Sequence, residues 1–345
     1  MFGWLTSILT GKQTAKPSDR RRAAPATAAR AKPKPAERFF DRLKEGLEPC
    51  PALSPEQEER VSEWVCRVVE HVEANPPEPP TVPALAPRIV EALKDPMIDA
   101  HRLSRLLEQD QAIAAKLLHV ANSPAYKPAS EITHLPGAVA YLGLNQVAQL
   151  AMGLATKALF DPDTRAQLAF DKPRWTRLFH HGMTTGLAAS SLHARKYRHV
   201  SDQVFLGGLF HDVGKSVALR AITELHLSGS WNETDPVIAD EVLHRLHAFP
   251  GSEFYDHWNL PQQIMDICAM HHQQEDQPQT SPEFHLICVA SSLDTLRSGS
   301  LAERREADRE LAQAAAALKL TDAELRAAQT EVRELGERVT LMFRS

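Results

Sequence analysis

Residues 99–126 read DAHRLSRLLEQDQAIAAKLLHVANSPAY and contain a clear structural signal. Asp99 and Asp110 each precede a segment in which apolar residues recur at intervals of three and four. These residues are Leu103, Leu106 and Leu107 in the first segment and Ile113, Leu117 and Val120 in the second. The spacing is typical of an amphipathic helix, and an aspartate directly before it is a good N-cap. Similar segments follow from residue 81 onward without a convincing alternating strand pattern, so we expect an all-α fold.

The first 36 residues differ in composition from the rest of the chain. Residues 1–10 are apolar, and residues 12–44 carry eleven Lys or Arg against three Asp or Glu. The Pro- and Ala-rich stretch 15–36 cannot build a core, so we expect a disordered, flexible linker. Residues 1–10 have two interpretations. The first is a peripheral membrane anchor, and the second is a disordered tail or a helix that docks on its own domain. The second alternative is favoured because ten residues bury little apolar area.

Residues 37–75 are predicted to form a helical segment. Ser54-Pro55-Glu56-Gln57 has a serine N-cap, proline at the first helical position and glutamine three residues after the cap, which indicates a helix start. The apolar side of this helix carries Val61, Trp64, Val65, Val68 and Val72. The run NPPEPP at 75–80 ends the helix and is predicted to be a domain boundary.

Residues 300–345 are predicted to add further helices at the C-terminal end. Apolar residues recur there every seven positions, with a second set three positions later: Leu311, Leu318, Leu325, Val332 and Val339, then Ala314, Ala328, Leu335 and Met342. This heptad pattern favours a coiled coil and a homodimer. However, Thr321-Asp322-Ala323-Glu324 is a capping box, which favours a new helix and therefore a hairpin packed on the main domain. The sequence supports both arrangements equally.

The composition is that of an ordinary globular protein, with 43% hydrophobic and 24% charged residues and a net charge of −5. Nucleic-acid binding is not expected, because the basic residues near the start lack interleaved aromatics. Four cysteines form no CxxC pair, and no apolar run approaches the roughly 20 residues of a membrane-spanning helix. We expect a cytoplasmic protein, with peripheral contact at the inner membrane face if residues 1–10 bind lipid.

The chain contains sixteen histidines, and candidate metal ligands occur at five places: His180-His181, His211-Asp212, His247, His271-His272 and Asp294. His211-Asp212 lies in GGLFHDVGK (207–215), at the end of an apolar helical stretch, where both side chains can turn toward one site. Imidazole supplies directional nitrogen ligands and a carboxylate can bridge two cations; iron, manganese and zinc all accept this combination. Lys215 can meet a phosphate as a point charge.

The histidine pair at 271–272 closes an apolar run that reads as a buried helix after Pro261. Burying two imidazoles without partners is costly. A metal ion would satisfy them, but so would carbonyls, water or exposure at the helix end. Each histidine alone is more often a structural residue than a ligand, and only the cluster favours a metal site.

Three segments in the first half resemble the HDOD family, the HD-related output domains. They are PTVPALAPRIVEALKDP (80–96), LLEQDQAIAAKLLHVANSPAY (106–126) and HLPGAVAYLGLNQVAQLAMGLA (134–155). The second half is similar to the HD superfamily in the order of its motifs: Trp175, His180-His181, GLFHDVGK (208–215), His247, Gly251, Trp258, Leu260-Pro261 and His271-His272. The resemblance spans 80–296, with a helical half at 80–165 and an HD-like half at 170–296. Several motifs in order are far more specific than one HD dipeptide.

This resemblance implies an all-helical domain used mainly in bacterial signal transduction, in which many members have lost the metal ligands. The present chain keeps a set similar to that of the metal-dependent HD-GYP phosphodiesterases. The implied ligand positions are His181 (with His180 as a neighbouring alternative), His211, Asp212, His247, His271, His272 and a late aspartate.

Two features depart from the HD-GYP pattern. The GYP segment is replaced by QQEDQPQTSPEF at 273–284. In LICVASSLDTL (286–296), Ser291 stands where the late aspartate belongs, and Asp294 follows one helical turn later. The loss of one acidic ligand would leave a weaker or mononuclear site, so one or two divalent ions are expected.

The sequence therefore supports two functions. The first is a signalling adaptor with a metal-binding HD-like pocket, whose partner is a signalling protein or a nucleotide ligand. The second is a metal-dependent phosphohydrolase or phosphodiesterase acting on a nucleotide or cyclic dinucleotide. Its catalytic residues would be His211, Asp212 and Lys215, with Lys215 binding the phosphate. The adaptor is favoured because the family resemblance and the missing GYP segment both point to it.

Overall fold

The computed structural model of the chain describes the following residues: 52–75, 84–93, 95–160, 165–246, 267 and 281–343. This part consists of α-helices and one short 3-10 helix, and none of its residues forms a strand. The predicted all-α class is therefore confirmed. The predictions for residues 1–51 and for His247, His271 and His272 fall outside the described residues.

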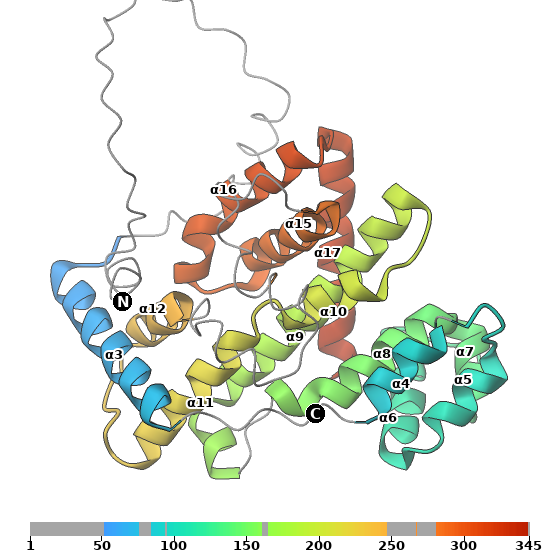
Figure 1. Cartoon of the computed structure of the whole chain (residues 1–345), viewed down its shortest axis with the longest axis horizontal. Coiled ribbons are helices and arrows are strands. Elements are labelled where there is room, and N and C mark those ends of the chain that lie inside the picture. The colour runs from blue at the N-terminus through green and yellow to red at the C-terminus, as the bar shows by residue number, and fades with distance from the viewer. Residues whose placement is uncertain are drawn as a thin grey trace, which may run out of the picture.

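The first group of helices follows the capped pattern seen in the sequence (Figure 1). It comprises α4 (Leu85–Leu93), α5 (Ala100–Leu107), α6 (Gln111–Ala121), α7 (Leu135–Leu142) and α8 (Leu144–Thr156), followed by the 3-10 helix η1 (Lys157–Phe160). The side chains of Asp99 and Asp110 accept hydrogen bonds from the backbone N–H groups of Arg102 at 2.8 Å and Ile113 at 3.0 Å. Both predicted N-caps are thus confirmed.

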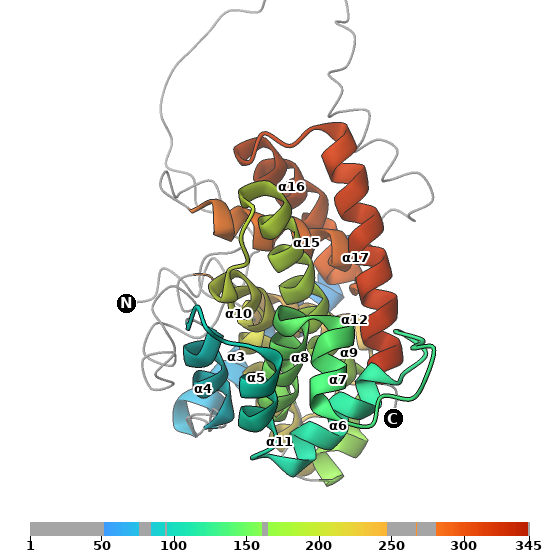
Figure 2. The same ribbon diagram turned by 90° about the vertical axis from the view of Figure 1, so that its right-hand side faces the viewer.

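The second group is arranged around one long helix, α9 (Figures 1 and 2). Its members are α9 (Arg165–Tyr197), α10 (Asp202–Phe210), α11 (Val213–Leu227), α12 (Pro236–Leu246), α15 (Pro282–Ser298), α16 (Leu301–Ala317) and α17 (Asp322–Met342). α9 is bent at Asp171, where φ is −150° and ψ is 52°, just before Pro173. Oδ1 of Asp171 accepts a hydrogen bond from the backbone N–H of Arg174 at 3.3 Å, so Asp171 caps the segment that begins after the bend, and Pro173 lies in the first turn, where proline is tolerated. Helices α10, α11, α15 and α17 all pack on α9.

Glycines bring α9 and α10 unusually close together. A Cβ on Gly182 would lie 2.6 Å from the carbonyl oxygen of Leu209, and a Cβ on Gly186 would lie 2.7 Å from that of Phe205. On the facing helix, a Cβ on Gly208 would lie 2.7 Å from the Cα of Gly186. Contacts this short leave no room for side chains, so the backbones of the two helices touch. Their approach brings the end of α10 next to the middle of α9.

Replacing Gly186 with alanine is expected to lower the melting temperature and to move α10 away from α9. Overpacking of a core costs about 1–3 kcal/mol, of which the better helix propensity of alanine returns up to about 1 kcal/mol. Gly153→Ala is the matched control, because its methyl group would meet only the flexible end of Met183. Thermal unfolding followed by circular dichroism should rank Gly186→Ala below Gly153→Ala. Equal melting temperatures would show that the close contact is not required.

The helix α3 (Pro55–Ala74) packs on α11 and α12, so the segment before the proline-rich run contacts the second group directly (Figure 1). Its Ser54 capping box and buried apolar side are as predicted. The rings of Trp64 and Trp231 lie 4.2 Å apart between centroids. Beside them, Arg60 forms an ion pair of 2.6 Å with Glu233. These contacts join α3 to the loop that leads into α12.

The C-terminal residues form two separate helices, α16 and α17, rather than one continuous helix. The capping box at Thr321 begins α17, as predicted. Both helices pack on α15, and α17 also packs along α9, where Glu331 pairs with Arg195 and accepts a hydrogen bond from Ser191 (Figure 2). The residues of the heptad pattern are all buried within the chain. Of the two arrangements that the sequence supports, the structure therefore has the second, in which the C-terminal helices pack on the main domain.

No single helix within the described ranges is long and apolar enough to cross a membrane. The neighbouring helices α7 and α8 together have sufficient length and apolar composition, but they are bent by 117°. Most of their apolar residues belong to the core, and Leu150 in α8 is completely buried. Their hydrophobicity is therefore explained by packing inside the protein.

Candidate metal site

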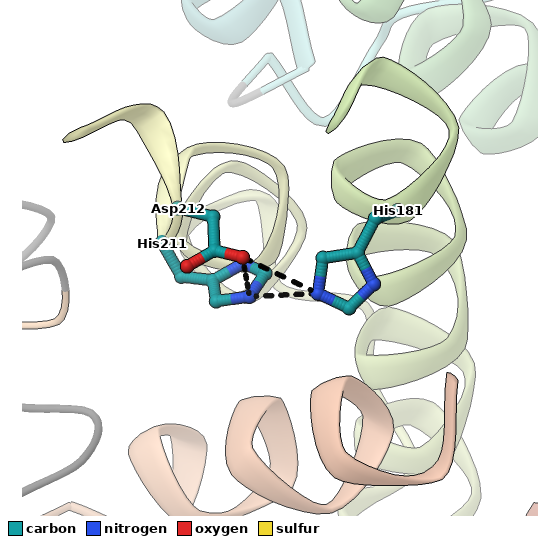
Figure 3. Close-up of side chains that lie close together, drawn as sticks. All are labelled: His181, His211 and Asp212. Atoms are coloured by element: carbon teal, nitrogen blue, oxygen red, sulfur yellow. Dashed lines mark hydrogen bonds and ion pairs between the residues drawn. The ribbon is translucent and has the colours of Figure 1, made fainter. Parts of the chain in front are cut away.

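Three side chains from three successive helices meet at the centre of the second group (Figure 3). His181 lies in the middle of α9, His211 is the C-terminal cap residue of α10, and Asp212 is the N-terminal cap residue of α11. The junction between α10 and α11 therefore carries two of them on consecutive residues. The glycine contacts between α9 and α10 place this junction opposite His181. All three side chains are buried, with relative exposures of 9%, 1% and 4%.

The three donor atoms form a nearly equilateral triangle. Nε2 of His181 lies 3.2 Å from Nε2 of His211, and each of these nitrogens lies 3.5 Å from Oδ2 of Asp212. Bonds of about 2.0–2.1 Å in a tetrahedral zinc site keep neighbouring ligand atoms about 3.4 Å apart. The triangle therefore fits two imidazole nitrogens and one carboxylate oxygen around a single divalent ion.

The outer nitrogens of the two histidines are both held by acceptors. Nδ1 of His211 lies 2.8 Å from the carbonyl oxygen of Gly208, and Nδ1 of His181 lies 2.7 Å from Oδ2 of Asp294. A carbonyl or carboxylate oxygen can only accept, so each Nδ1 carries the hydrogen. When such a ring is neutral, Nε2 has its lone pair directed toward the triangle. This arrangement is typical of histidines that bind metals.

Asp294 lies behind His181, at the outer nitrogen, and is not one of the three converging donors. The hydroxyl oxygen of Ser291, one turn earlier on α15, lies 3.0 Å from Nε2 of His211 and 3.4 Å from Nε2 of His181. Serine thus faces the triangle where a carboxylate was expected from the resemblance. Because a serine hydroxyl is neutral, the described residues provide one carboxylate donor for a cation.

Lys215 lies beside the triangle and is enclosed by acidic groups. Its Nζ donates to Oδ2 of Asp212 at 2.6 Å and to Oε1 of Glu303 at 2.7 Å. Burial would lower the pKa of this lysine, but the charges of the two carboxylates outweigh burial and raise the pKa. A phosphate contact through Lys215 stays a prediction, and it would require one of these two pairs to open.

Carboxylates also set the protonation of His181. Burial alone would lower the pKa of this imidazole, but the hydrogen bond to Asp294 and the charges of Asp294 and Asp212 outweigh burial and raise the pKa. Burial would raise the pKa of Asp294, yet His181 and the guanidinium of Arg297 hold that pKa below its usual value. Without a metal ion, His181 therefore keeps a proton readily. A cation that binds Nε2 must displace that proton.

Sequence reasoning found the three converging residues and also named Lys215, Ser291 and Asp294, which lie beside them, but it missed other neighbours. Of the pair His180-His181, only His181 reaches the triangle; the ring of His180 lies 6.4 Å from that of Phe343. Neither Arg297 nor Glu303 was expected at the site. Glu303 could have been noticed, because it occupies the last position of the capping box at Ser300. Arg297 could also have been noticed, because it follows Asp294 by three residues on the same helix, a spacing at which opposite charges meet.

The chain belongs to the HDOD domain family, whose model matches residues 80–274. Two solved structures share its fold. One is an HDOD domain protein with unknown function from Geobacter sulfurreducens, with 22% identity and a TM-score of 0.56 over 83% of this chain and 100% of that one. The other is a candidate metal-dependent phosphohydrolase from Shewanella amazonensis SB2B, with 19% identity and a TM-score of 0.55 over 81% and 99% of the two chains.

A curated relative, an uncharacterized protein of Treponema pallidum (strain Nichols), is 23% identical over 199 residues. The match covers 56% of this chain and 37% of the relative, so the present chain spans little more than a third of that protein's length. These comparisons establish the family and the fold. The chemistry of the site depends on the residues themselves.

Proposed function

We propose that this protein is a signal-transduction adaptor whose HDOD domain binds one divalent metal ion through His181, His211 and Asp212. The observation that supports the proposal is the triangle of donor atoms, with separations of 3.2 to 3.5 Å. Iron, manganese and zinc all accept such a mixed set of ligands. In this role the ion would stabilise the junction of α9, α10 and α11, and a signalling protein or nucleotide would read the resulting conformation.

Two features of the site favour binding over catalysis. Lys215, the cation nearest to the triangle among the described residues, is already paired with Asp212 and Glu303. Ser291 supplies a neutral hydroxyl where a second carboxylate would help to hold a second ion. A mononuclear site in which the charge of the lysine is balanced by two carboxylates is well suited to a structural or sensing role. It has fewer charged groups with which to orient a phosphate.

Hydrolysis of a phosphate ester is the second candidate function. It is favoured by the number of protein donors, since catalytic zinc sites keep three protein ligands and leave the fourth position open. It is also favoured by the likeness to the Shewanella protein, which shares the fold. When bound, the ion would polarise a phosphoryl oxygen and lower the pKa of a water molecule. A nucleotide or a cyclic dinucleotide is the class of substrate that we would test.

Metal analysis and a hydrolysis assay separate these functions. We expect the full-length protein, purified without added metal, to contain about one equivalent of iron, manganese or zinc by mass spectrometry. We expect no turnover of bis-p-nitrophenyl phosphate or cyclic dinucleotides by the metal-loaded protein. Turnover that disappears in Asp212→Asn would establish the hydrolase instead. Protein that neither contains metal nor binds it on titration would contradict both functions.

A further inference from the structure

Asp294 shares its two oxygens between the candidate metal ligand and an arginine. Oδ2 lies 2.7 Å from Nδ1 of His181, whereas Oδ1 accepts hydrogen bonds from Nε of Arg297 at 3.0 Å and from Nη2 of the same residue at 2.6 Å. Asp294 itself is completely buried. Since the carboxylate is planar, a guanidinium bound to Oδ1 fixes the direction in which Oδ2 meets the imidazole.

The guanidinium of Arg297 is in turn confined by the last helix of the protein. α17 passes over it at Gly336, where an added Cβ would lie 2.6 Å from Cζ and 3.0 Å from Nε of Arg297. The arginine therefore lies directly against the backbone of α17, and any other residue at position 336 would displace it. Residues 322–342 lie beyond the part of the chain that matches the HDOD family.

We propose that Arg297 is a positioning residue of the metal site and that α17 holds it in place through Gly336. Arg297 would orient Asp294, and Asp294 would hold the imidazole of His181 with Nε2 directed at the ion. Partners of this kind, which bind the outer nitrogen of a ligating histidine, fix its tautomer and raise its basicity. The inference rests on the proposed function, because His181, the residue that Arg297 and Asp294 would position, is one of the proposed metal ligands.

A coupling between α17 and the metal ion follows from this arrangement. If docking of α17 strengthens the site, metal binding must strengthen the docking of α17 by the same factor. A partner protein that pulls α17 away would release the ion more easily. The C-terminal helix would then be the element through which the state of the metal site is read.

Three variants and one control test the positioning role. Arg297→Met removes the guanidinium and is expected to weaken binding of Zn²⁺ or Mn²⁺ by about 10- to 100-fold, the usual effect of losing a partner of a metal ligand. Arg297→Lys keeps one charged donor and should restore part of the affinity. Gly336→Ala displaces the guanidinium from the side of α17 and should also weaken binding. Arg333→Met removes an exposed arginine from α17 and should bind metal like the wild type.

Affinities are measured by calorimetry on the metal-free full-length protein, at a temperature where circular dichroism shows every variant to be folded. If Arg297→Met and Gly336→Ala bind as tightly as the wild type, or if Arg333→Met weakens binding equally, the proposal is wrong.

A second readout is the tautomer of His181. It is measured from two-bond ¹⁵N–¹H spectra of histidine-labelled protein at alkaline pH, and the signals are assigned with His181→Gln.

The two readouts separate failure of this inference from failure of the proposed function. If the wild type binds no metal, the proposed function fails and the tautomer decides the inference. A hydrogen that leaves Nδ1 of His181 in Arg297→Met, but not in Arg333→Met, would still support the positioning role. An unchanged tautomer would overturn it.

Discussion

Asp212→Asn is expected to lower the affinity for Zn²⁺ or Mn²⁺ by at least about 100-fold, more than the loss of a partner behind a ligand would do. The substitution keeps the shape of the side chain but removes the single negative charge among the three converging donors. Lys215 retains Glu303 as a partner at 2.7 Å, so the fold should persist. Calorimetric titration of the metal-free protein measures the change directly.

The same variant should lose the stabilisation that metal gives to the wild type. A metal at 100 times its Kd stabilises the folded state by about 2.7 kcal/mol, which corresponds to roughly 5–10 °C in Tm for a domain of this size. A chelator should therefore lower the Tm of the wild type but not that of Asp212→Asn. Asp240→Asn is the control, because it also removes a carboxylate charge, but one that pairs with Arg174 and Arg177 and is not among the three converging donors. Unchanged metal affinity in Asp212→Asn would remove this carboxylate from the ligand set.

Local signals in the sequence were sufficient for the helices. Asp99, Asp110, Ser54 and Thr321 all act within three residues of themselves, by accepting a hydrogen bond from a nearby backbone N–H. Such caps depend on the adjacent backbone alone and can be read from the sequence. The choice between a coiled coil and packed helices depended on distant surfaces. A heptad pattern describes one apolar face, and it does not say which surface covers that face.

The candidate site also has a part that can be predicted from the sequence and a part that depends on the packing of distant helices. His211 and Asp212 are adjacent in the chain, so their proximity follows from the sequence, and the family resemblance selected His181 from the pair His180-His181. The spatial roles of Asp294 and Lys215 could not be read in advance. Asp294 binds the outer side of His181, and Lys215 pairs across to α16, because α15 packs on α9 and α16 packs on α15. Crossing geometry arises from packing of whole helices and leaves no short motif.

Glu303→Ala is expected to be strongly destabilising, because Glu303 has two roles. It completes the capping box of α16, and it forms a largely buried ion pair with Lys215. Its Oε2 accepts from the backbone N–H of Ser300 at 2.7 Å, while its Oε1 accepts from Lys215 at 2.7 Å. Removal of one partner of a buried ion pair costs about 3–5 kcal/mol. The lower end applies here, since Lys215 keeps Asp212. The urea midpoint and the Tm should both fall, the latter by about 6–12 °C at roughly 3 kcal/mol.

The protein contains its own matched control for this prediction. Glu324 occupies the same position in the capping box of α17 and accepts from Thr321 at 2.7 Å, but it is exposed to solvent. Glu324→Ala should therefore cost only the cap, about 0.5–1 kcal/mol. If the two variants lose equal stability, the ion pair with Lys215 contributes nothing beyond capping.

Acidification should remove the contribution that the ionised Glu303 makes to the free energy of unfolding. Burial would raise the pKa of this carboxyl, but Lys215 and Arg177 hold it well below the usual 4.5. A depressed pKa in the folded state gives stability that is present above the unfolded-state pKa and is lost as the pH falls through the folded-state pKa. The gap in unfolding free energy between wild type and Glu303→Gln should thus be full at pH 7 and narrow below about pH 4.5. Because the glutamine variant cannot ionise, a gap that stays constant on acidification would mean that the charge of Glu303 does not stabilise the junction between α16 and the candidate metal site.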